Sequence, residues 1–501
     1  MSNNHLKNLL LENSSTFIDF LSLLNDILNN FKDWLETDRP RPVDKPDYVS
    51  KSKIPRNPME PSRIMDIFLK RIKKARRLNR RNLESLAPVP LYPALIGFLV
   101  AQIVNPNNIE DWDLNSSWSV TPNLEKECIY MLSEMVGYDP EKSTGNIVSS
   151  GTVANLTALL VARDKKYGNK IKYEGLFKLP KGVILTSAAS HFSIDKSARI
   201  LGLGEKNVIK VPVATSEDIE NFLKDGTPFS LKPPRTIYED VLNRLREKRV
   251  QIICVIPTAG TTVTGTIEPI KYLVDFRSEF DFHLHVDAAF GAYAKLIREE
   301  ELESKMKGLE EADSITVDPH KWGYVPYPCG TILFKEKHDL DLLKYEVSYL
   351  KNVAPTLEGS RPGASAAACW IALKTLGWKG YGQLLNKCMD NAKYLVERLH
   401  EEGYQLLHEV DLFTVNFRIV VKGKRHSEIN KLNRKLVKEI NKRNNFRVGF
   451  LEDLAGIRIV EDGKEYPIQG IKIVLMNPLI THELIEKLID EIKESAKKLA
   501  K

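Results

Sequence analysis

One lysine stands just after a short β-branched stretch, in the sequence SITVDPHKW of residues 314–322. The run of Ile, Thr and Val predicts a strand that stops at an Asp-Pro break, so Lys321 would lie past the strand end beside His320. An ε-amine shielded from water can lose its proton and form a Schiff base with a carbonyl group. A surface lysine after a strand is the ordinary alternative for such a pair taken alone.

A carboxylate occupies the same kind of place slightly earlier in the chain. Residues 285–289, HVDAA, predict an apolar strand that ends in Asp287 and is followed by small residues. In a pyridoxal phosphate site, a carboxylate holds the pyridinium nitrogen and a lysine holds the aldehyde. Asp287 and Lys321 together therefore predict pyridoxal 5'-phosphate as a cofactor.

Three further segments carry polar groups at predicted strand ends or helix starts. In SSGTVAN, residues 149–155, Gly151 and Thr152 open a helix where backbone N–H groups can converge on an anion, although an ordinary helix cap looks the same. His191 precedes another helix and could stack on a planar cofactor or serve as a structural hydrogen-bonding residue. Thr258, in TAGTT, could bind a phenolic oxygen or belong to a common turn.

The elements that must position these residues alternate between short apolar strands and helical patterns, which is typical of an α/β fold with a mostly parallel sheet. The length of 501 residues favours two or three structural units. We expect an N-terminal helical segment with a Pro-rich arm (1–85), a large domain (86–365) and a small α/β domain (366–501). The predicted strands of the large domain are 145–149, 183–186, 208–213, 252–256, 283–286, 314–317 and 330–334, and its predicted helices are 153–166, 193–201, 270–279 and 292–295.

The small domain has its own predicted pattern, which starts after the apolar helix 364–376. It consists of a strand (413–421), a helix (427–443), paired strands (446–452 and 456–460), a strand (471–476) and a final helix (481–499). At the other end of the chain, residues 5–36 predict a helix broken near residue 14, and residues 62–82 predict a basic amphipathic helix. A nucleic-acid-binding surface would have aromatic residues between its basic ones, and none lies within the basic run of this helix. We therefore expect its apolar stripe of Ile64, Ile67, Phe68 and Ile72 to pack on a partner while its basic face is solvated.

Composition limits the class of protein. The net charge of +7 is a mild excess that neither requires nor excludes anionic partners. Five scattered cysteines without a C-x-x-C pair suit a reducing cytoplasm and give no metal-ligand spacing. The N-terminus lacks the pattern of a secretory signal, and the longest apolar run, 91–104, is too short to span a bilayer. We therefore expect a cytoplasmic protein without a metal, a membrane segment or a nucleic-acid partner.

The order of these motifs resembles the group II pyridoxal-dependent amino acid decarboxylases, over residues 85–380 with clear motifs and more loosely beyond. The resemblance implies the type I fold of pyridoxal-dependent transferases (aspartate aminotransferase-like), a homodimer with a shared active site, and release of CO2 from an amino acid. It also implies the following roles: Lys321 as the Schiff-base lysine, His320 as a phosphate neighbour, Asp287 as the pyridinium partner, Ala289 and His191 against the two ring faces, Gly151 and Thr152 in the phosphate loop, and Thr258 at the phenolic oxygen.

Two details of the resemblance concern the substrate and the reaction. Residues 354–363, which include Arg361, are similar to a segment of sphingosine phosphate lyase, so a carbon–carbon lyase is the alternative activity. Residues 347–351 resemble the mobile loop of aromatic decarboxylases, which implies that Tyr349 returns a proton to the substrate Cα. This resemblance favours decarboxylation over the lyase activity. The resemblance further implies substrate contacts from Arg361 and from Tyr92, although the segment 89–93 lacks the histidine usual in the family.

Overall fold

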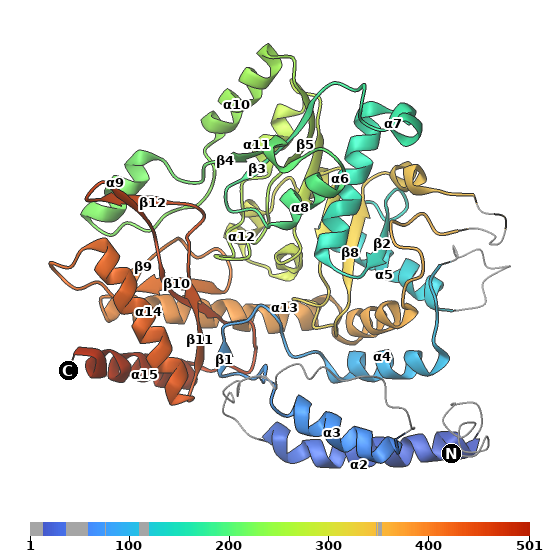
Figure 1. Cartoon of the computed structure of the whole chain (residues 1–501), viewed down its shortest axis with the longest axis horizontal. Helices are drawn as coiled ribbons and strands as arrows, with labels where there is room; N and C mark the ends of the chain where they lie inside the picture. The colour runs from blue at the N-terminus through green and yellow to red at the C-terminus, as the bar shows by residue number, and fades with distance from the viewer. Residues whose placement is uncertain are drawn as a thin grey trace.

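The computed structural model describes residues 14–36, 59–75, 77–109, 120–346, 348 and 353–500. A large sheet wrapped by helices forms one body, and a smaller sheet backed by two helices lies at its side (Figure 1). Two N-terminal helices form a separate layer beneath the large body.

The large sheet has seven strands in the order β2-β8-β7-β6-β5-β3-β4. Strand β8 runs antiparallel to both of its neighbours, and all the other pairs are parallel. All seven predicted strands are present, with ends shifted by no more than a few residues. Their bounds are β2 Thr144–Val148, β3 Gly182–Ser187, β4 Val208–Val211, β5 Gln251–Ile256, β6 His283–Asp287, β7 Ser314–Val317 and β8 Gly330–Phe334.

Side chains alternate between the two faces of this sheet, and a helical layer covers each face. Val183 and Leu185 of β3 pack with helices α10 and α11, whereas Ile184 packs with α6 and α8. This burial on both faces explains why central strands such as β3 and β5 are mostly apolar. The helices are α5 Thr121–Val136, α6 Gly151–Tyr167, α7 Asn169–Glu174, α8 Ser193–Ile200, α9 Ser216–Lys224, α10 Arg235–Glu247, α11 Lys271–Phe276 and α12 Glu300–Lys305, with short 3-10 turns η1 Glu205–Asn207, η2 Ala292–Leu296, η3 Leu309–Glu311 and η4 Lys337–Leu343.

The small sheet has the order β1-β11-β14-β10-β9 and is covered by α14 and α15. Its first strand, β1, comes from the N-terminal segment and pairs in parallel with β11. The predicted pairing of 446–452 with 456–460 is wrong, because β11 pairs with β1 and β14 while β12 forms a separate hairpin with β13. The bounds are β1 Asn82–Leu83, β9 Gln405–Leu406, β10 Thr414–Arg418, β11 Arg447–Leu451, β12 Arg458–Glu461, β13 Lys464–Pro467, β14 Gly470–Val474, α14 His426–Arg443 and α15 His482–Ala500.

Helix α13, Gly363–Glu401, connects the two sheets. Its first part packs on α4 (Tyr92–Val104) and α5, and its second part packs on the small domain. The two parts meet at Gly377, whose φ of 55° and ψ of −173° interrupt the helix. A residue without a Cβ adopts this backbone conformation most readily.

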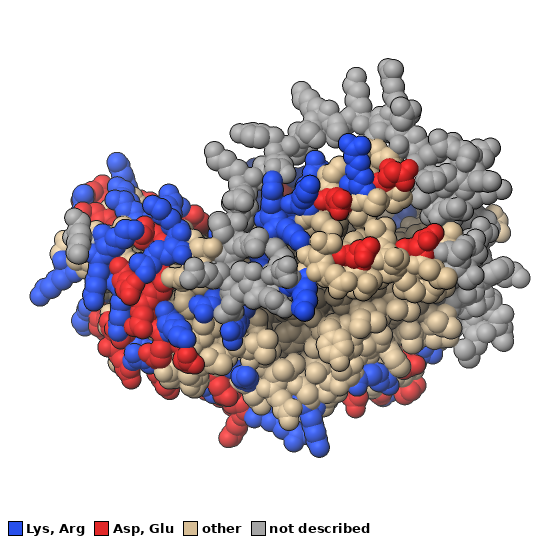
Figure 2. Space-filling view, turned by 90° about the horizontal axis from the view of Figure 1, so that it is seen from below, with Lys and Arg blue, Asp and Glu red and all other residues tan. Residues whose placement is uncertain are grey.

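The N-terminal helices are α2, Ser14–Glu36, and α3, Pro61–Ile72, which lie side by side. The predicted helix 62–82 is too long: α3 stops at Ile72, and Asn82 already belongs to β1. The apolar stripe of α3 is open, with Phe68 51% exposed. Figure 2 views this side of the molecule and shows broad uncharged surface beside the densely charged small domain. No helix within the described residues is long and apolar enough to cross a membrane.

Candidate active site

A cavity of about 160 Å³ opens at the carboxyl ends of β5, β6 and β7, beside the N-terminus of α6. The parallel strands end at one edge of the sheet, so residues far apart in the sequence meet there. Eight of the predicted site residues line this cavity together: Gly151, Thr152, His191, Thr258, Asp287, Ala289, His320 and Lys321.

Lys321 is held by a carboxylate three residues before it. Its Nζ lies 2.9 Å from Oδ2 of Asp318, and the turn between them is closed by a backbone hydrogen bond of 2.8 Å. Burial disfavours the ammonium form, but the charge of Asp318 and its hydrogen bond outweigh burial, and the pKa of Lys321 is raised above its usual value. The amine is therefore protonated at neutral pH and has a proton acceptor in contact.

The N-terminus of α6 forms the wall opposite Lys321. Ser150 caps the helix by accepting a hydrogen bond from the N–H of Val153 at 3.4 Å. Gly151 stands so close to Asp318 that a Cβ there would lie 2.7 Å from its Oδ2. Only glycine fits at this contact, and the exposed first turn of a helix attracts anions.

His320 contributes a neutral imidazole. Its Nδ1 accepts a hydrogen bond from the N–H of Cys329 at 3.3 Å, and its Nε2 lies 3.4 Å from Oδ2 of Asp318. Burial lowers the pKa of His320 against the opposing charge of Asp318. Its ring also packs on Tyr327 at a centroid distance of 4.0 Å. His320 can therefore donate one hydrogen bond from Nε2.

Asp287 is fixed by an amide that sequence reasoning did not select. Nδ2 of Asn155 donates to Oδ2 of Asp287 and to Oγ of Ser193, both at 2.9 Å. The Ser193 hydroxyl in turn lies 2.8 Å from Nδ1 of His191, which also accepts from the Ser193 N–H at 3.3 Å. One side chain of α6 thus connects Asp287 with His191. Burial lowers the pKa of His191, so that its ring is neutral with the proton on Nε2.

A buried chain of hydrogen bonds fixes the orientation of the Asn155 amide. Its Oδ1 accepts from Thr316 at 2.6 Å and from Nε2 of His285 at 3.1 Å. Nδ1 of His285 accepts from Ser314, which also bonds Nε2 of His283. Burial lowers the pKa of His285 to about 4, so this chain stays neutral and its donors all point toward Asp287.

Two buried polar atoms around the cavity have no hydrogen-bond partner among the described residues. Their positions can be compared with the groups that pyridoxal 5'-phosphate would present. Oγ1 of Thr258 and Oδ1 of Asp318 are buried without a hydrogen bond. The Thr258 backbone is anchored by Glu268, whose Oε2 accepts its N–H at 2.8 Å. Pyridoxal 5'-phosphate has a phosphate that suits the helix N-terminus, a phenolic oxygen that suits the free hydroxyl of Thr258, and a ring nitrogen that suits the carboxylate of Asp287. These three groups are placed around Lys321, which can bind the aldehyde. These residues fit the cofactor.

The predicted substrate residues lie elsewhere. Arg361 is buried and forms an ion pair with Glu125; it also donates to the carbonyls of Ile147 at 2.7 Å and Asn108 at 3.0 Å. Tyr92 is 77% exposed at the start of α4 and does not line the cavity. Tyr349 lies outside the described residues.

Asn155 and Asp318 are site residues that the sequence analysis quoted in motifs without giving them a role. Asn155 is a polar residue within the buried, mostly apolar face of α6. Asp318 stands three residues before Lys321, the spacing of a side-chain pair within one turn. Those two features are the signals by which they could have been found.

The comparison with known families agrees with this chemistry. A model described as the pyridoxal-dependent decarboxylase conserved domain matches residues 79–420, so the chain belongs to this family. The chain is similar to an L-2,4-diaminobutyrate decarboxylase from Acinetobacter baumannii, with 25% identity over 87% of this chain and 83% of the relative. It is 34% identical to a probable L-tyrosine/L-aspartate decarboxylase from Methanothermobacter thermautotrophicus, over 59% of this chain and 73% of the relative.

Solved structures show the same fold. One of them is the glutamate decarboxylase domain of a diaminobutyrate-pyruvate transaminase and L-2,4-diaminobutyrate decarboxylase from Vibrio parahaemolyticus. It superposes with a TM-score of 0.79 over 99% of this chain and 100% of that chain, at 22% identity. A tryptamine-bound Oryza sativa structure has a TM-score of 0.81, with coverages of 97% and 99% at 17% identity. The predicted type I α/β fold is thereby confirmed.

The predicted class of activity is confirmed as well. The protein is a pyridoxal phosphate-dependent carboxy-lyase that decarboxylates an amino acid. The relatives described above have decarboxylase names, and none of those names is that of a sphingosine phosphate lyase.

Proposed function

We propose that the cavity around Lys321 removes the α-carboxylate of an L-amino acid and yields the corresponding amine. The observation that supports this most is the convergence of Lys321, Asp287, His191 and Thr258 on one cavity beside the N-terminus of α6. Pyridoxal 5'-phosphate, when bound, supplies an electron sink for the bond that breaks at Cα.

In this proposal each residue holds a different part of the cofactor. Gly151, Thr152 and the first turn of α6 bind the phosphate, with His320 as a neighbouring donor. Thr258 donates its free hydroxyl to the phenolic oxygen, and Asp287 keeps the ring nitrogen protonated. His191 and Ala289 hold the two faces of the ring. Lys321 would hold the aldehyde, and Asp318, 2.9 Å from its Nζ, would orient the amine.

Proton return to Cα is assigned to Tyr349, on the resemblance of residues 347–351 to a closing loop. In Tyr349→Phe, substrate should still be consumed slowly, while the amine yield collapses and, in aerated buffer with dissolved O2 as the oxidant, carbonyl products appear. Ser348→Ala, a change next to Tyr349 that leaves the phenol in place, serves as the matched control. Amine formation at the wild-type rate in Tyr349→Phe would remove Tyr349 from this role.

The test of the function itself is a substrate survey. Release of CO2 and formation of amine should be measured for the twenty amino acids and L-2,4-diaminobutyrate, with L-aspartate and L-tyrosine as first candidates because similar proteins bear those names. Borohydride reduction should attach a pyridoxyl group to Lys321, as read by mass spectrometry. Cleavage of a phosphorylated long-chain base without CO2 release from any amino acid would favour the lyase.

We also propose a homodimer that shares its active sites. Helix α4 exposes a row of large apolar side chains, among them Ile96, Val100 and Val104, and α3 exposes Ile67 and Phe68. Such a continuous apolar surface is unusual on a monomer. The double variant Ile96→Glu with Val100→Glu should shift the mass in light scattering to that of the monomer. Leu479→Glu, at a residue of the small domain that is somewhat more exposed, should not.

The proposed location is the cytoplasm. The five cysteines are all buried free thiols, which suits a reducing compartment.

A further inference from the structure

A second pocket, of about 770 Å³, opens at the edge of the small sheet and shares no lining residue with the cavity around Lys321. It lies between the end of α9, the edge strand β9 and the loop that joins β10 to α14. Its lining includes three cationic side chains, Arg418, Lys422 and Lys424, against a single acidic one, Asp225.

Arg418 is unusual because it is a buried cation with only neutral partners. Its side chain ends β10 and is 4% exposed. Nε donates to Oε1 of Gln405 at 2.7 Å, Nη1 lies 3.0 Å from Nδ1 of His426, and the guanidinium packs on the Phe222 ring at 4.6 Å. Within the part of the chain that is described, no carboxylate lies within ion-pair distance of Arg418. Buried charges are normally paired, as Arg361 is with Glu125.

The acidic residues nearby already have other partners. Glu461 accepts hydrogen bonds from the N–H groups of His426 at 2.8 Å and Ser427 at 3.2 Å, and thereby caps α14. Asp462 forms an ion pair with Arg425 at 2.9 Å. Asp225 accepts from the N–H and hydroxyl of Thr227 at 3.1 and 2.6 Å. The positive charge of Arg418 therefore has no counter-charge from these neighbours, and burial alone lowers its pKa to about 10.

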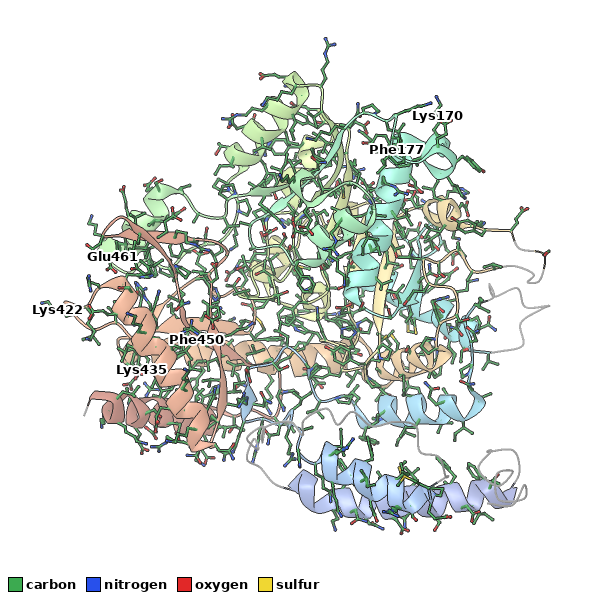
Figure 3. The ribbon with its side chains drawn as sticks, viewed as in Figure 1. Lys170, Phe177, Lys422, Lys435, Phe450 and Glu461 are labelled. Atoms are coloured by element: carbon green, nitrogen blue, oxygen red, sulfur yellow. The ribbon has the colours of Figure 1, made fainter. Side chains whose placement is uncertain are left out.

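The remaining donor of Arg418 faces the pocket. Nη2 makes no hydrogen bond to any described residue. It is not fully enclosed by protein atoms, so it borders the open space of the pocket. Lys422 and Lys424 stand at the rim, exposed and without ion pairs in the described structure, and Figure 3 shows Lys422 projecting from the outer edge of the small domain.

We propose that this pocket binds a small oxyanion, a phosphate or carboxylate group, with Arg418 as the buried contact and Lys422 and Lys424 as long-range attraction. A guanidinium with free N–H donors matches the planar geometry of such groups, and charge-assisted hydrogen bonds are roughly twice as strong as neutral ones. The site is separate from the cofactor cradle of α6, because it is built from the small domain and α9.

The test is binding by the holoenzyme, in which the cofactor already fills the phosphate cradle. Inorganic phosphate and succinate are titrated separately by calorimetry and by thermal unfolding, with KCl at matched ionic strength as the blank. We expect saturable binding of at least one anion and a rise in Tm that grows with its concentration. Saturation by phosphate alone assigns the phosphate group, and saturation by succinate alone assigns the carboxylate group. No saturable binding of either anion beyond the KCl blank would overturn the proposal.

Variants locate the site. Arg418→Gln should weaken anion binding at least tenfold, and Lys422→Glu with Lys424→Glu should weaken it several-fold, without touching a buried residue and therefore without a folding defect. Arg434→Gln is the matched control, because Arg434 lies on α14 and is paired with Glu452. Equal affinity in the Lys422/Lys424 double variant and wild type, or loss in Arg434→Gln as large as in Arg418→Gln, would refute this location.

Discussion

The amide of Asn155 donates a hydrogen bond of 2.9 Å to Oδ2 of Asp287, and the same Nδ2 reaches Ser193, which contacts His191. The carboxylate below the cofactor position and the imidazole beside it are therefore set by one side chain of α6. The His285–Ser314–His283 chain holds that side chain from the protein interior, so groups buried beneath the sheet edge determine how the site is oriented.

Asn155→Ala should show the importance of this link. Removal of the amide leaves Asp287 and Ser193 without their shared donor, and we expect kcat to fall about 10- to 100-fold, as for other residues that orient a catalytic group. The pH at which the bound cofactor changes its absorbance should also move, which a merely structural defect would not cause. Thr157→Ala, also buried on α6 but bonded only to its own helix, is the control. A normal kcat in Asn155→Ala would contradict the role.

Asp287→Asn removes the charge that would keep the ring nitrogen protonated. Turnover should fall by about 10²-fold or more, because the loss is electrostatic and lies at the reacting system. The fold should survive, since the new amide can still accept the hydrogen bond from Asn155. Circular dichroism and steady-state kinetics check the two expectations; turnover within a factor of two of wild type would mean that the carboxylate is structural.

Arg361→Gln separates a structural role from substrate binding. Breaking the buried pair leaves Glu125 charged and without its partner, which should cost about 3–5 kcal/mol of unfolding free energy. Chemical unfolding measures this loss. The double variant Arg361→Gln with Glu125→Gln should recover part of it, because no isolated charge is then buried. If Arg361→Gln instead raises KM at unchanged stability, the predicted contact with substrate is correct.

His408 should make the stability of the small domain depend on pH. Burial lowers the pKa of His408 to about 4, below its ordinary value of 6.5, so the unfolded chain binds the proton first as the pH falls. Its contribution, up to roughly 3 kcal/mol, is present above pH 6.5 and is lost between pH 6.5 and about 4. In His408→Gln, urea unfolding at pH 7, 6 and 5 should show a shallower decline than in wild type. An unchanged decline would be the contrary result.

The central strands of the large sheet, such as β3 and β5, were predictable because they are mostly apolar runs that are buried on both faces. The convergence of Asp287, Lys321 and Thr258 followed from one rule, that parallel strands end at a common edge. These are local patterns joined by simple geometry, and they predicted an α/β fold with a mostly parallel sheet; the type I fold and most of the residue roles were implied by the family resemblance.

Contacts made through tertiary packing could not be predicted in the same way. The pairing of β11 with β1 joins strands that are more than 300 residues apart, and no local pattern indicates it. Arg361 resembles a substrate-binding residue in the sequence, but the structure shows that it pairs with Glu125. The role of Asn155 depends on which face of α6 points to the site. In each case the partner is far away in the sequence, and neither propensity nor spacing identifies it.

The strand β1 also affects the order in which the molecule can be completed during synthesis. Glu84 and Arg447 form a 2.7 Å ion pair beside this strand although they are 363 residues apart in the sequence. All seven strands of the large sheet leave the ribosome before β11 exists, so the large domain can fold while β1 still waits for its partner. One of the first strands to be made is thus among the last to be fixed, and a nascent chain stalled before residue 447 would hold β1 unpaired beside a complete large sheet.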